Sequence, residues 1–195
     1  SVDALRTDEA YASALGRELN ACVAENAFKF ANVHPRQDGY DFSATDQLVS
    51  FARSRGMKLR GHTLVWHNQL PAWLTQGKWT RDQAIDILRD HITTLVTRYK
   101  GAVWAWDVVN EAVADDGSGL RTTSFWYRTI GPDYVTMAFR FAREADPDVL
   151  LYYNDYGAED MGAKSNAVYA LVSDLKTQGV SVDGVGWQMH IVSGF

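Results

Sequence analysis

Short apolar runs alternate with longer amphipathic stretches along the whole chain. The short runs are rich in branched and aromatic side chains and have the length of buried strands, at residues 20–25, 57–65, 102–109, 149–154 and 184–190. The longer stretches repeat apolar side chains at helical spacing, at residues 8–19, 43–54, 80–99, 132–145 and 163–178. Strands that alternate with helices predict an α/β protein whose parallel strands are joined by helical crossovers.

Local signals predict where three of these helices begin or end. Ser43 is a suitable N-cap for the helix at 43–54, and Thr80 with Gln83 has the spacing of a capping box. Gly179 is expected to stop the helix at 163–178. These signals therefore place the three helices between successive predicted strands.

Polar or aromatic side chains follow the end of every predicted strand. The segment 104–112 is the clearest case, since an aromatic and branched run ends directly in Asn110 and Glu111. The other strand ends carry Glu25, Asn26, Lys29, His62, Trp66, His67, Asn68, Asn154, Asp155, Tyr156, Gln188 and His190. Parallel strands place their carboxyl ends on one rim, which is where βα-barrels build their active sites. An open doubly wound sheet usually carries a Gly-rich phosphate loop after an early strand, and no such loop occurs, so the barrel-type rim is favoured.

Taken singly, each of these residues has an ordinary structural explanation. His62 alone is equally compatible with a core histidine, and Glu111 alone with a helix cap or an ion pair. Coincidence at five successive strand ends is much less probable, so we interpret the rim as a functional site. His62 and His67 lack the spacing of helical metal ligands, and no His-Glu-x-x-His pattern occurs. The sequence therefore predicts neither a metal site nor a cofactor.

Composition and charge exclude several classes of function. The 195 residues suffice for one core, and 46% hydrophobic with 22% charged residues is ordinary for a globular domain. A net charge of −5 argues against nucleic acid as a partner, and no apolar run is long enough to cross a membrane. Cys22 is the only cysteine, so an intrachain disulfide is excluded, and we expect it to be buried. The 12% of aromatic residues would suit a carbohydrate site.

The strand-end motifs closely resemble those of the family 10 glycoside hydrolases, the endo-β-1,4-xylanases. The segment at 60–73 (RGHTLVWHNQLPAW) resembles the most distinctive motif of that family, and 106–112 (WDVVNEA) its strand-four motif. The remaining matches are 25–29 (ENAFK), 153–156 (YNDY) and 184–190 (GVGWQMH), in the order of the family. The resemblance covers residues 1–195 and implies part of a (β/α)8 TIM barrel that cleaves xylan with retention of configuration. It also implies an extracellular, secreted protein.

The resemblance implies a role for each matching residue. Glu111 corresponds to the general acid/base, and Asn110 to the residue that bonds the 2-hydroxyl of the sugar being cleaved. His190 corresponds to the histidine that bonds the nucleophile. The residues that correspond to the glycone-side sugar-binding set are Asn26, Lys29, His62, Trp66 and Gln188.

The family's second carboxylate has no counterpart in this sequence. The nucleophile of the family is a glutamate in a Thr-Glu-Leu-Asp type motif on strand seven, and no such motif occurs. We therefore expect an incomplete barrel, covering about strands two to six, completed by a second chain or by a missing C-terminal segment. Asp155 and Glu25 share the rim but are structural or supporting residues in the family's pattern. Asp107 is expected to face away from Asn110 and to be a buried hydrogen-bond acceptor.

Three hypotheses follow. The chain is part of an enzyme whose remainder lies elsewhere, a non-catalytic xylan-binding fragment, or a self-associating structural fragment. The intact set of Asn110, Glu111, His62 and His190 favours the enzyme. Without the strand-seven glutamate, we expect the isolated chain to be inactive.

Overall fold

Five parallel strands form one sheet in the computed structural model, which describes residues 2–190. Their spatial order is β1-β2-β3-β4-β5, the same as their order in the sequence. Their bounds are β1 (Ala21–Val23), β2 (Lys58–Val65), β3 (Val103–Asn110), β4 (Leu150–Asp155) and β5 (Gly184–Trp187). A doubly wound sheet would reverse this order at a switch point, whereas a barrel adds each strand beside the previous one. The order therefore confirms the prediction of a barrel-type sheet.

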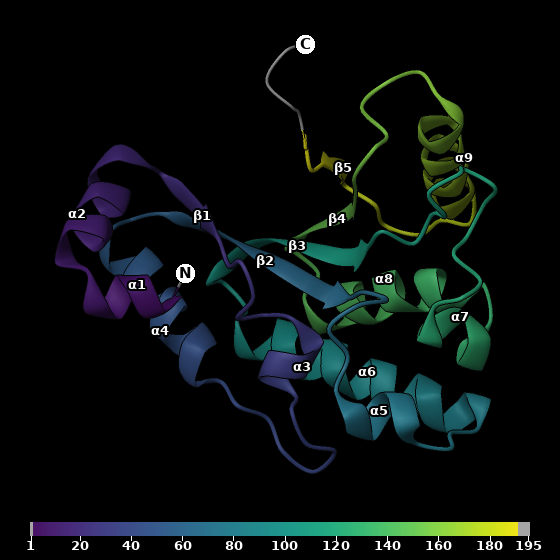
Figure 1. The fold of residues 1–195 in the computed structure, drawn as a ribbon, viewed down its shortest axis with the longest axis horizontal. Coiled ribbons are helices and arrows are strands. Elements are labelled where there is room, and N and C mark those ends of the chain that lie inside the picture. Colours follow the sequence, from purple (N-terminus) through teal and green to yellow (C-terminus); the bar gives the residue numbers. More distant parts are fainter. Residues whose placement is uncertain (1, 191–195) are drawn as a thin grey trace.

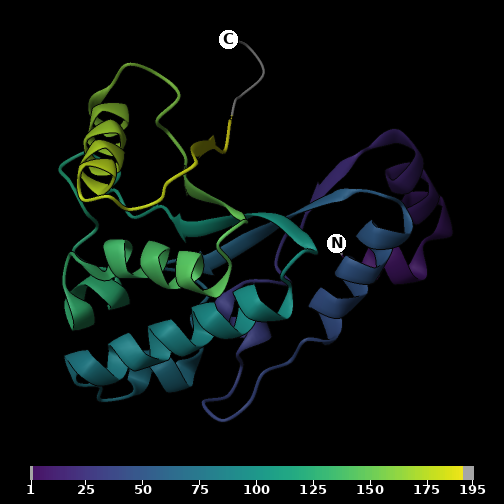
Figure 2. The ribbon, with the colours of Figure 1, turned by 180° about the vertical axis from the view of Figure 1, so that it is seen from behind.

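The helices wrap one side of the sheet and its two ends, as Figures 1 and 2 show. Helices α4 and α6 contact β2, and α8 contacts β3 and β4. The α1–α2 pair lies at the β1 end, and α9 at the other end. The bounds are α1 (Val2–Thr7), α2 (Glu9–Glu18), α3 (Phe30–Val33), α4 (Ser43–Ser54), α5 (Ala72–Gln76), α6 (Arg81–Arg98), α7 (Phe125–Ile130), α8 (Tyr134–Ala145) and α9 (Ala163–Thr177). No helix of the described residues is long and apolar enough to span a membrane.

Buried apolar side chains fix the positions of β3 and α6 in the fold. β3 is buried from Ala105 to Asn110, because helices cover one face of the sheet and other side chains fill the opposite face. Helix α6 buries Leu88, Ile92 and Leu95 completely, as its spacing predicts. The predicted capping box is present, since the Gln83 main-chain N–H donates to Thr80 Oγ1 at 3.3 Å and the Thr80 N–H donates to Gln83 Oε1 at 2.9 Å.

Three local predictions were wrong. Ser43 is not the cap of α4: the Asp41 carboxylate accepts from the Ser43 main-chain N–H and hydroxyl, which lowers the pKa of Asp41. Cys22 is only half-buried, because β1 is an edge strand with one neighbour. The last strand ends at Trp187 rather than at residue 190, since Met189 has a left-handed φ of 52° that no strand accommodates.

Gly61 lies where β2 passes the Trp106 ring, and Gly61→Ala should destabilise the fold by about 2–3 kcal/mol. A Cβ at position 61 would lie 2.1 Å from a carbon of that fully buried ring, so the ring or the strand must move. Urea unfolding measures the loss. Gly39→Ala is the matched control, because its nearest atom is the end of the exposed, flexible Arg36 side chain, and we expect a change below about 0.5 kcal/mol. Equal stability of the two variants would contradict the packing argument.

Candidate functional site

The Glu111 carboxyl group lies at the centre of the rim formed by the carboxyl ends of the strands. It directly follows β3 and is 6% exposed. Three side chains donate hydrogen bonds to it: Trp66 Nε1 to Oε2 at 2.7 Å, Gln188 Nε2 to Oε1 at 2.8 Å and Asn110 Nδ2 to Oε1 at 3.1 Å. The structure thus brings together residues of three strand ends that the sequence predicted to converge.

The main chain turns sharply at Glu111. Its φ of 56° is left-handed, a conformation that costs a residue with a side chain about 1–2 kcal/mol. The Glu111 main-chain N–H donates to the Asn154 carbonyl at 2.8 Å, which ties the turn to β4. Such strained residues persist where their surroundings determine them fully, and they concentrate at functional sites.

Three amide side chains and a histidine continue the hydrogen-bond network around the carboxylate. Asn110 Oδ1 accepts from Asn154 Nδ2 at 2.8 Å and from Gln188 Nε2 at 3.2 Å. His190 Nε2 lies 2.9 Å from Gln188 Oε1. Asn110, Gln188 and His190 therefore meet as predicted, although Gln188 and His190 lie beyond the end of β5 rather than on it.

Lys29, Asn26 and Trp66 form the side of the rim near β1. The Lys29 ammonium lies 4.9 Å from the centre of the Trp66 ring and donates to Asn26 Oδ1 at 2.9 Å. Partial burial lowers the pKa of Lys29, while the charges of Glu25 and Glu111 act in the opposite direction. The Trp66 ring thus lies between the Lys29 ammonium and the Glu111 carboxylate, with a contact to each.

His62 belongs to a hydrogen-bonded group with Arg60 and the buried Asp107. The Asp107 carboxylate, 2% exposed, lies 2.9 Å from His62 Nδ1 and accepts from Arg60 Nε at 3.0 and 3.1 Å. Arg60 Nη2 also lies 3.5 Å from Asn154 Oδ1, and Asn154 in turn donates to Asn110 Oδ1. Asp107 is a buried hydrogen-bond acceptor, as predicted. The prediction that it faces away from Asn110 was wrong: the strand pairing shifts between Asp107 and Val109, and this irregularity reverses the alternation of side chains.

The other carboxylates of the rim already have partners or lie elsewhere. Asp155 is fully buried, lies 2.9 Å from Lys164 Nζ and accepts from the Tyr153 hydroxyl. Burial, followed by the Asp155 charge, raises the pKa of Tyr153. Glu25 lines a separate cavity of about 380 Å³. Neither carboxylate is therefore placed as a free partner to Glu111.

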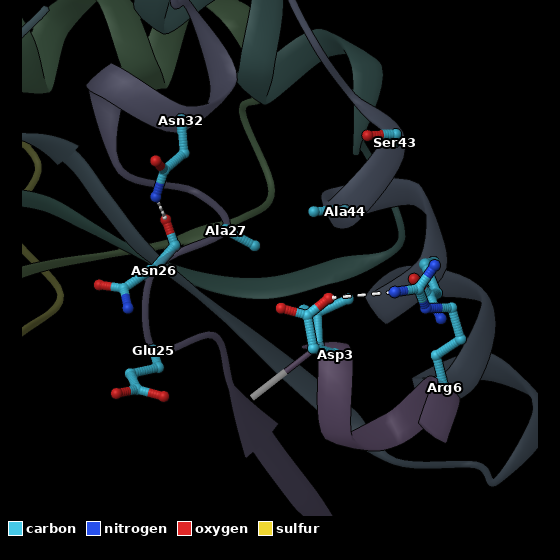
Figure 3. Close-up of a pocket in the computed structure, with 10 residues that line it drawn as sticks. Asp3, Arg6, Glu25, Asn26, Ala27, Asn32, Ser43 and Ala44 are labelled. Carbon is cyan, nitrogen blue, oxygen red and sulfur yellow. Dashed lines mark hydrogen bonds and ion pairs between the residues drawn. The ribbon is translucent and has the colours of Figure 1, made fainter. Parts of the chain in front are cut away.

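Figure 3 shows this cavity between α1, the loop after β1 and the start of α4. Asn26 and Glu25 lie along one wall, and the Asp3–Arg6 ion pair along another. Asn26 is the one member of the predicted sugar-binding set among its lining residues. The cavity therefore does not coincide with the predicted set. Across residues 2–190 no group of three or more His, Cys, Asp or Glu side chains is arranged to hold a metal ion.

Sequence reasoning missed the residues that support Asn110 and Glu111 from behind. Asn154 was noted at a strand end but not assigned to the site, although it contacts both residues through its side chain and carbonyl. Arg60 entered only as the first residue of the motif at 60–73, and Arg121 was not predicted as a site residue. The signal for Arg60 was its place two residues before His62 on β2, on the same face of the strand.

The chain matches the family model of glycosyl hydrolase family 10 over residues 1–194. Endo-1,4-β-xylanase B of Thermotoga neapolitana is 48% identical over 183 residues, which cover 94% of this chain and 52% of that protein. Endo-1,4-β-xylanase B of Paenibacillus barcinonensis is 46% identical over 180 residues, 90% of this chain and 54% of that protein. The chain spans about half the length of these relatives.

Solved structures give the same result for the fold. Xylanase 10B of Thermotoga petrophila, in complex with xylobiose, superimposes with a TM-score of 0.93 at 48% identity, over 97% of this chain and 57% of that one. A mutant of an intracellular xylanase of Thermoanaerobacterium saccharolyticum, in complex with xylotriose, gives 0.92 at 39% identity, over 97% of this chain and 62% of that one. The five strands therefore form a half-barrel that matches part of the TIM barrel of these xylanases.

Proposed function

The chain belongs to glycosyl hydrolase family 10, and we propose that it forms part of a retaining endo-1,4-β-xylanase that hydrolyses internal bonds of xylan. One observation carries the proposal. Glu111 lies buried at the end of β3, in a strained turn, with three side-chain donors on its carboxylate. A carboxyl group held in this way beside an open rim is suited to transfer a proton at one defined position.

In the proposed mechanism Glu111 acts twice. Its protonated form first donates a proton to the leaving glycosidic oxygen, and its carboxylate then removes a proton from the attacking water. Asn110, held by Asn154 and Gln188, would bond the 2-hydroxyl of the sugar being cleaved. His190 would contact the nucleophile, which we place on a segment outside these 195 residues.

Retaining hydrolysis requires a second carboxyl group about 5–5.5 Å from the first. Asp155 is paired with Lys164 and Asp107 with Arg60, so neither is available for attack at the sugar. We therefore propose that a further segment, on the same polypeptide or a second one, supplies the nucleophile and completes the barrel. The unpaired edges of β1 and β5 in the described sheet are the places where further strands would add.

The proposed substrate contacts begin at the Trp66 ring. Asn26, Lys29, His62, Trp66 and Gln188 would form the glycone side of the xylan site. Lys29 and Trp66 lie together, and His62 joins the same network through Asp107 and Arg60. Two related xylanases were solved with xylobiose and with xylotriose, which supports xylo-oligosaccharides as ligands of this chain.

We expect the 195-residue chain alone to release no reducing sugar from xylan above a no-protein control. Adding a polypeptide that carries the remaining family strands and their glutamate should produce hydrolysis, because it supplies the missing nucleophile. Reducing-end assays, with the particle mass measured by light scattering, give the result. Ordinary xylanase rates from a monomer of this chain would contradict the mechanism.

Binding separates the enzyme from the two other hypotheses. Isothermal titration of the chain with xylotriose should show saturable binding, as an enzyme part or a xylan-binding fragment requires. Binding without activity in the completed barrel would favour the non-catalytic fragment. A dimer that binds no sugar would favour the structural one.

We also propose that the complete protein acts outside the cell, because xylan is a polymer too large to cross a membrane. One relative is described as intracellular, so location varies among similar proteins. Cell fractionation of the source organism, with antibody against this chain, decides the point.

A further inference from the structure

Arg121 contacts the main chain on the C-terminal side of the catalytic turn at three successive carbonyl groups. Its Nε donates to the Glu111 carbonyl at 3.4 Å and its Nη2 to the Val113 carbonyl at 3.2 Å. Its own main-chain N–H donates to the Ala112 carbonyl at 2.7 Å. One residue thus fixes the carbonyl groups of residues 111, 112 and 113.

The same stretch is held from its other side by β4. The Glu111 main-chain N–H donates to the Asn154 carbonyl, and the Val113 N–H donates to the Tyr153 hydroxyl at 3.1 Å. Hydrogen bonds on both sides of Glu111 therefore hold its main chain in the left-handed conformation. Removing the Arg121 side chain would leave the β4 contacts and the main-chain bond to Ala112, and it would free the carbonyl groups of Glu111 and Val113.

A charged cluster on the rim fixes the Arg121 guanidinium in turn. Its Nη2 lies 2.8 Å from Asp115 Oδ1, and that oxygen also accepts from the Tyr156 hydroxyl at 2.5 Å. Lys164 Nζ lies 3.6 Å from Asp115 and 2.9 Å from Asp155. The bonds from Arg121 and Tyr156 lower the pKa of Asp115, so the pair stays charged through the neutral range. The Arg121 side chain is 15% exposed, which limits competition from water.

We propose that Arg121 is a positioning residue, which holds the backbone turn at Glu111 so that its carboxylate meets Trp66, Asn110 and Gln188. The inference rests on the proposed function for the meaning of Glu111, but the placement of its carboxylate can be measured without any reaction. Arg121 touches the Glu111 main chain and acts on the reacting group only through it.

The Trp66 indole N–H reports directly on the carboxylate, because it donates to Glu111 Oε2 at 2.7 Å. In a ¹H–¹⁵N spectrum of the chain, Trp66→Phe identifies this indole signal among those of the seven tryptophans. Glu111→Ala gives the position of the signal when the acceptor is absent. The wild-type and Glu111→Ala positions then form an internal scale.

In Arg121→Met we expect the Trp66 signal to move most of the way to its Glu111→Ala position. Arg121→Lys keeps the charge but not the geometry of the guanidinium, so it should give an intermediate shift. If Arg121→Met does not fold, Arg121→Lys decides by the same scale. A Trp66 signal that stays at its wild-type position in a folded variant would overturn the proposal.

Arg143 provides the matched control. It donates to the carbonyl groups of Asp146, Pro147 and Val149 and pairs with Asp183 at 2.8 Å, so it too binds three carbonyls and a carboxylate. It does so before β4 begins, at the opposite end of the sheet from Glu111. Arg143→Met should lower stability and leave the Trp66 signal in place. An equal shift in Arg143→Met would show that general loosening, and not positioning, moves the signal.

Xylan hydrolysis by the completed barrel tests the proposed function, whereas the Trp66 signal tests the positioning of Glu111. If Arg121→Met moves the Trp66 signal but the wild-type assembly hydrolyses no xylan, positioning holds and the proposed function fails. If the wild type is active and the signal does not respond, the proposed function holds and positioning fails.

Discussion

Glu111→Gln should reduce xylan hydrolysis by the completed barrel about 10²–10⁴-fold, because an amide neither donates nor accepts the proton in the proposed mechanism. The amide has nearly the shape of the carboxyl group, and its oxygen can still accept the Trp66 N–H. Xylotriose binding should therefore change little. The variant therefore loses activity in the chemical step only: kcat for xylan falls, while the Kd for xylotriose measured by titration stays near the wild-type value.

The leaving group provides an independent check on the same variant. The aryl group of an aryl xyloside leaves without being protonated. The rate of the first step should therefore fall much less on an aryl xyloside than on xylan. The second step still needs a base, and a burst of released phenol followed by slow turnover is expected. Glu144→Gln is the matched control, since Glu144 pairs with Arg89 on the exposed surface. Near-wild-type hydrolysis of xylan by Glu111→Gln would refute the assignment of the acid/base.

The placement of the site residues could be predicted from the sequence where the strands are regular. Asn110 and Glu111 lie at a strand end as expected, because the branched and aromatic run before them fixes β3 in the core. Prediction failed at Asp107, since the pairing irregularity before Val109 leaves no mark in the apolar pattern. It also failed for the lengths of β1 and β5, whose edges lack a second neighbour.

Contacts to main-chain groups could not be predicted in the same way. Arg121 binds carbonyl oxygens, which every residue carries, so no partner side chain marks the interaction in the sequence. The stacking of His34, Phe30 and His91 joins the start of α3 to α6, more than fifty residues away. Spacing along the chain carries no information about such pairs, which follow from how the helices pack on the sheet.

Two buried histidines that stack on Phe30 should make the fold sensitive to mild acid. His91 is fully buried and His34 nearly so, and no ring nitrogen of either makes a hydrogen bond of ordinary geometry. The Phe30 ring stacks on His91 at 3.8 Å, and the Tyr40 ring on His34 at 3.9 Å. These planar contacts leave little room for the water that a charged imidazole requires.

Burial lowers the pKa of both histidines in the folded chain, and the neighbouring His34 lowers that of His91 further. The Gln37 main chain and, less strongly, the Asp90 charge raise the pKa of His34, and the Leu64 main chain raises that of His91, but burial is the largest effect on both. Asp90 itself is engaged by the Tyr40 hydroxyl at 2.7 Å. Burial therefore dominates, and both rings stay neutral in the folded state at neutral pH.

Stability should fall as the pH drops below about 6.5, since the unfolded chain then takes up protons that the folded chain does not. Each histidine contributes a slope of about 1.4 kcal/mol per pH unit until its own folded pKa is reached. Two such histidines give up to about 2.8 kcal/mol per unit. The paired carboxylates Asp41, Asp46 and Asp115 have lowered pKa values and lose their stabilisation only below about pH 4, outside this window.

Urea unfolding at pH 7.5 and pH 5.5 measures the difference, and His91→Leu should remove the larger part of it, because leucine carries no proton in either state and burial lowers the pKa of His91 furthest. His34→Leu should remove a smaller part, and the double variant should keep only a small difference, due to the partly buried His67, whose pKa burial also lowers. His190→Gln is the control, since His190 is exposed and lies outside this aromatic packing. A pH dependence that survives in the double variant would mean that other groups carry it. A lost dependence would locate the acid sensitivity in the aromatic packing of Phe30, His34 and His91, which joins α3 to α6.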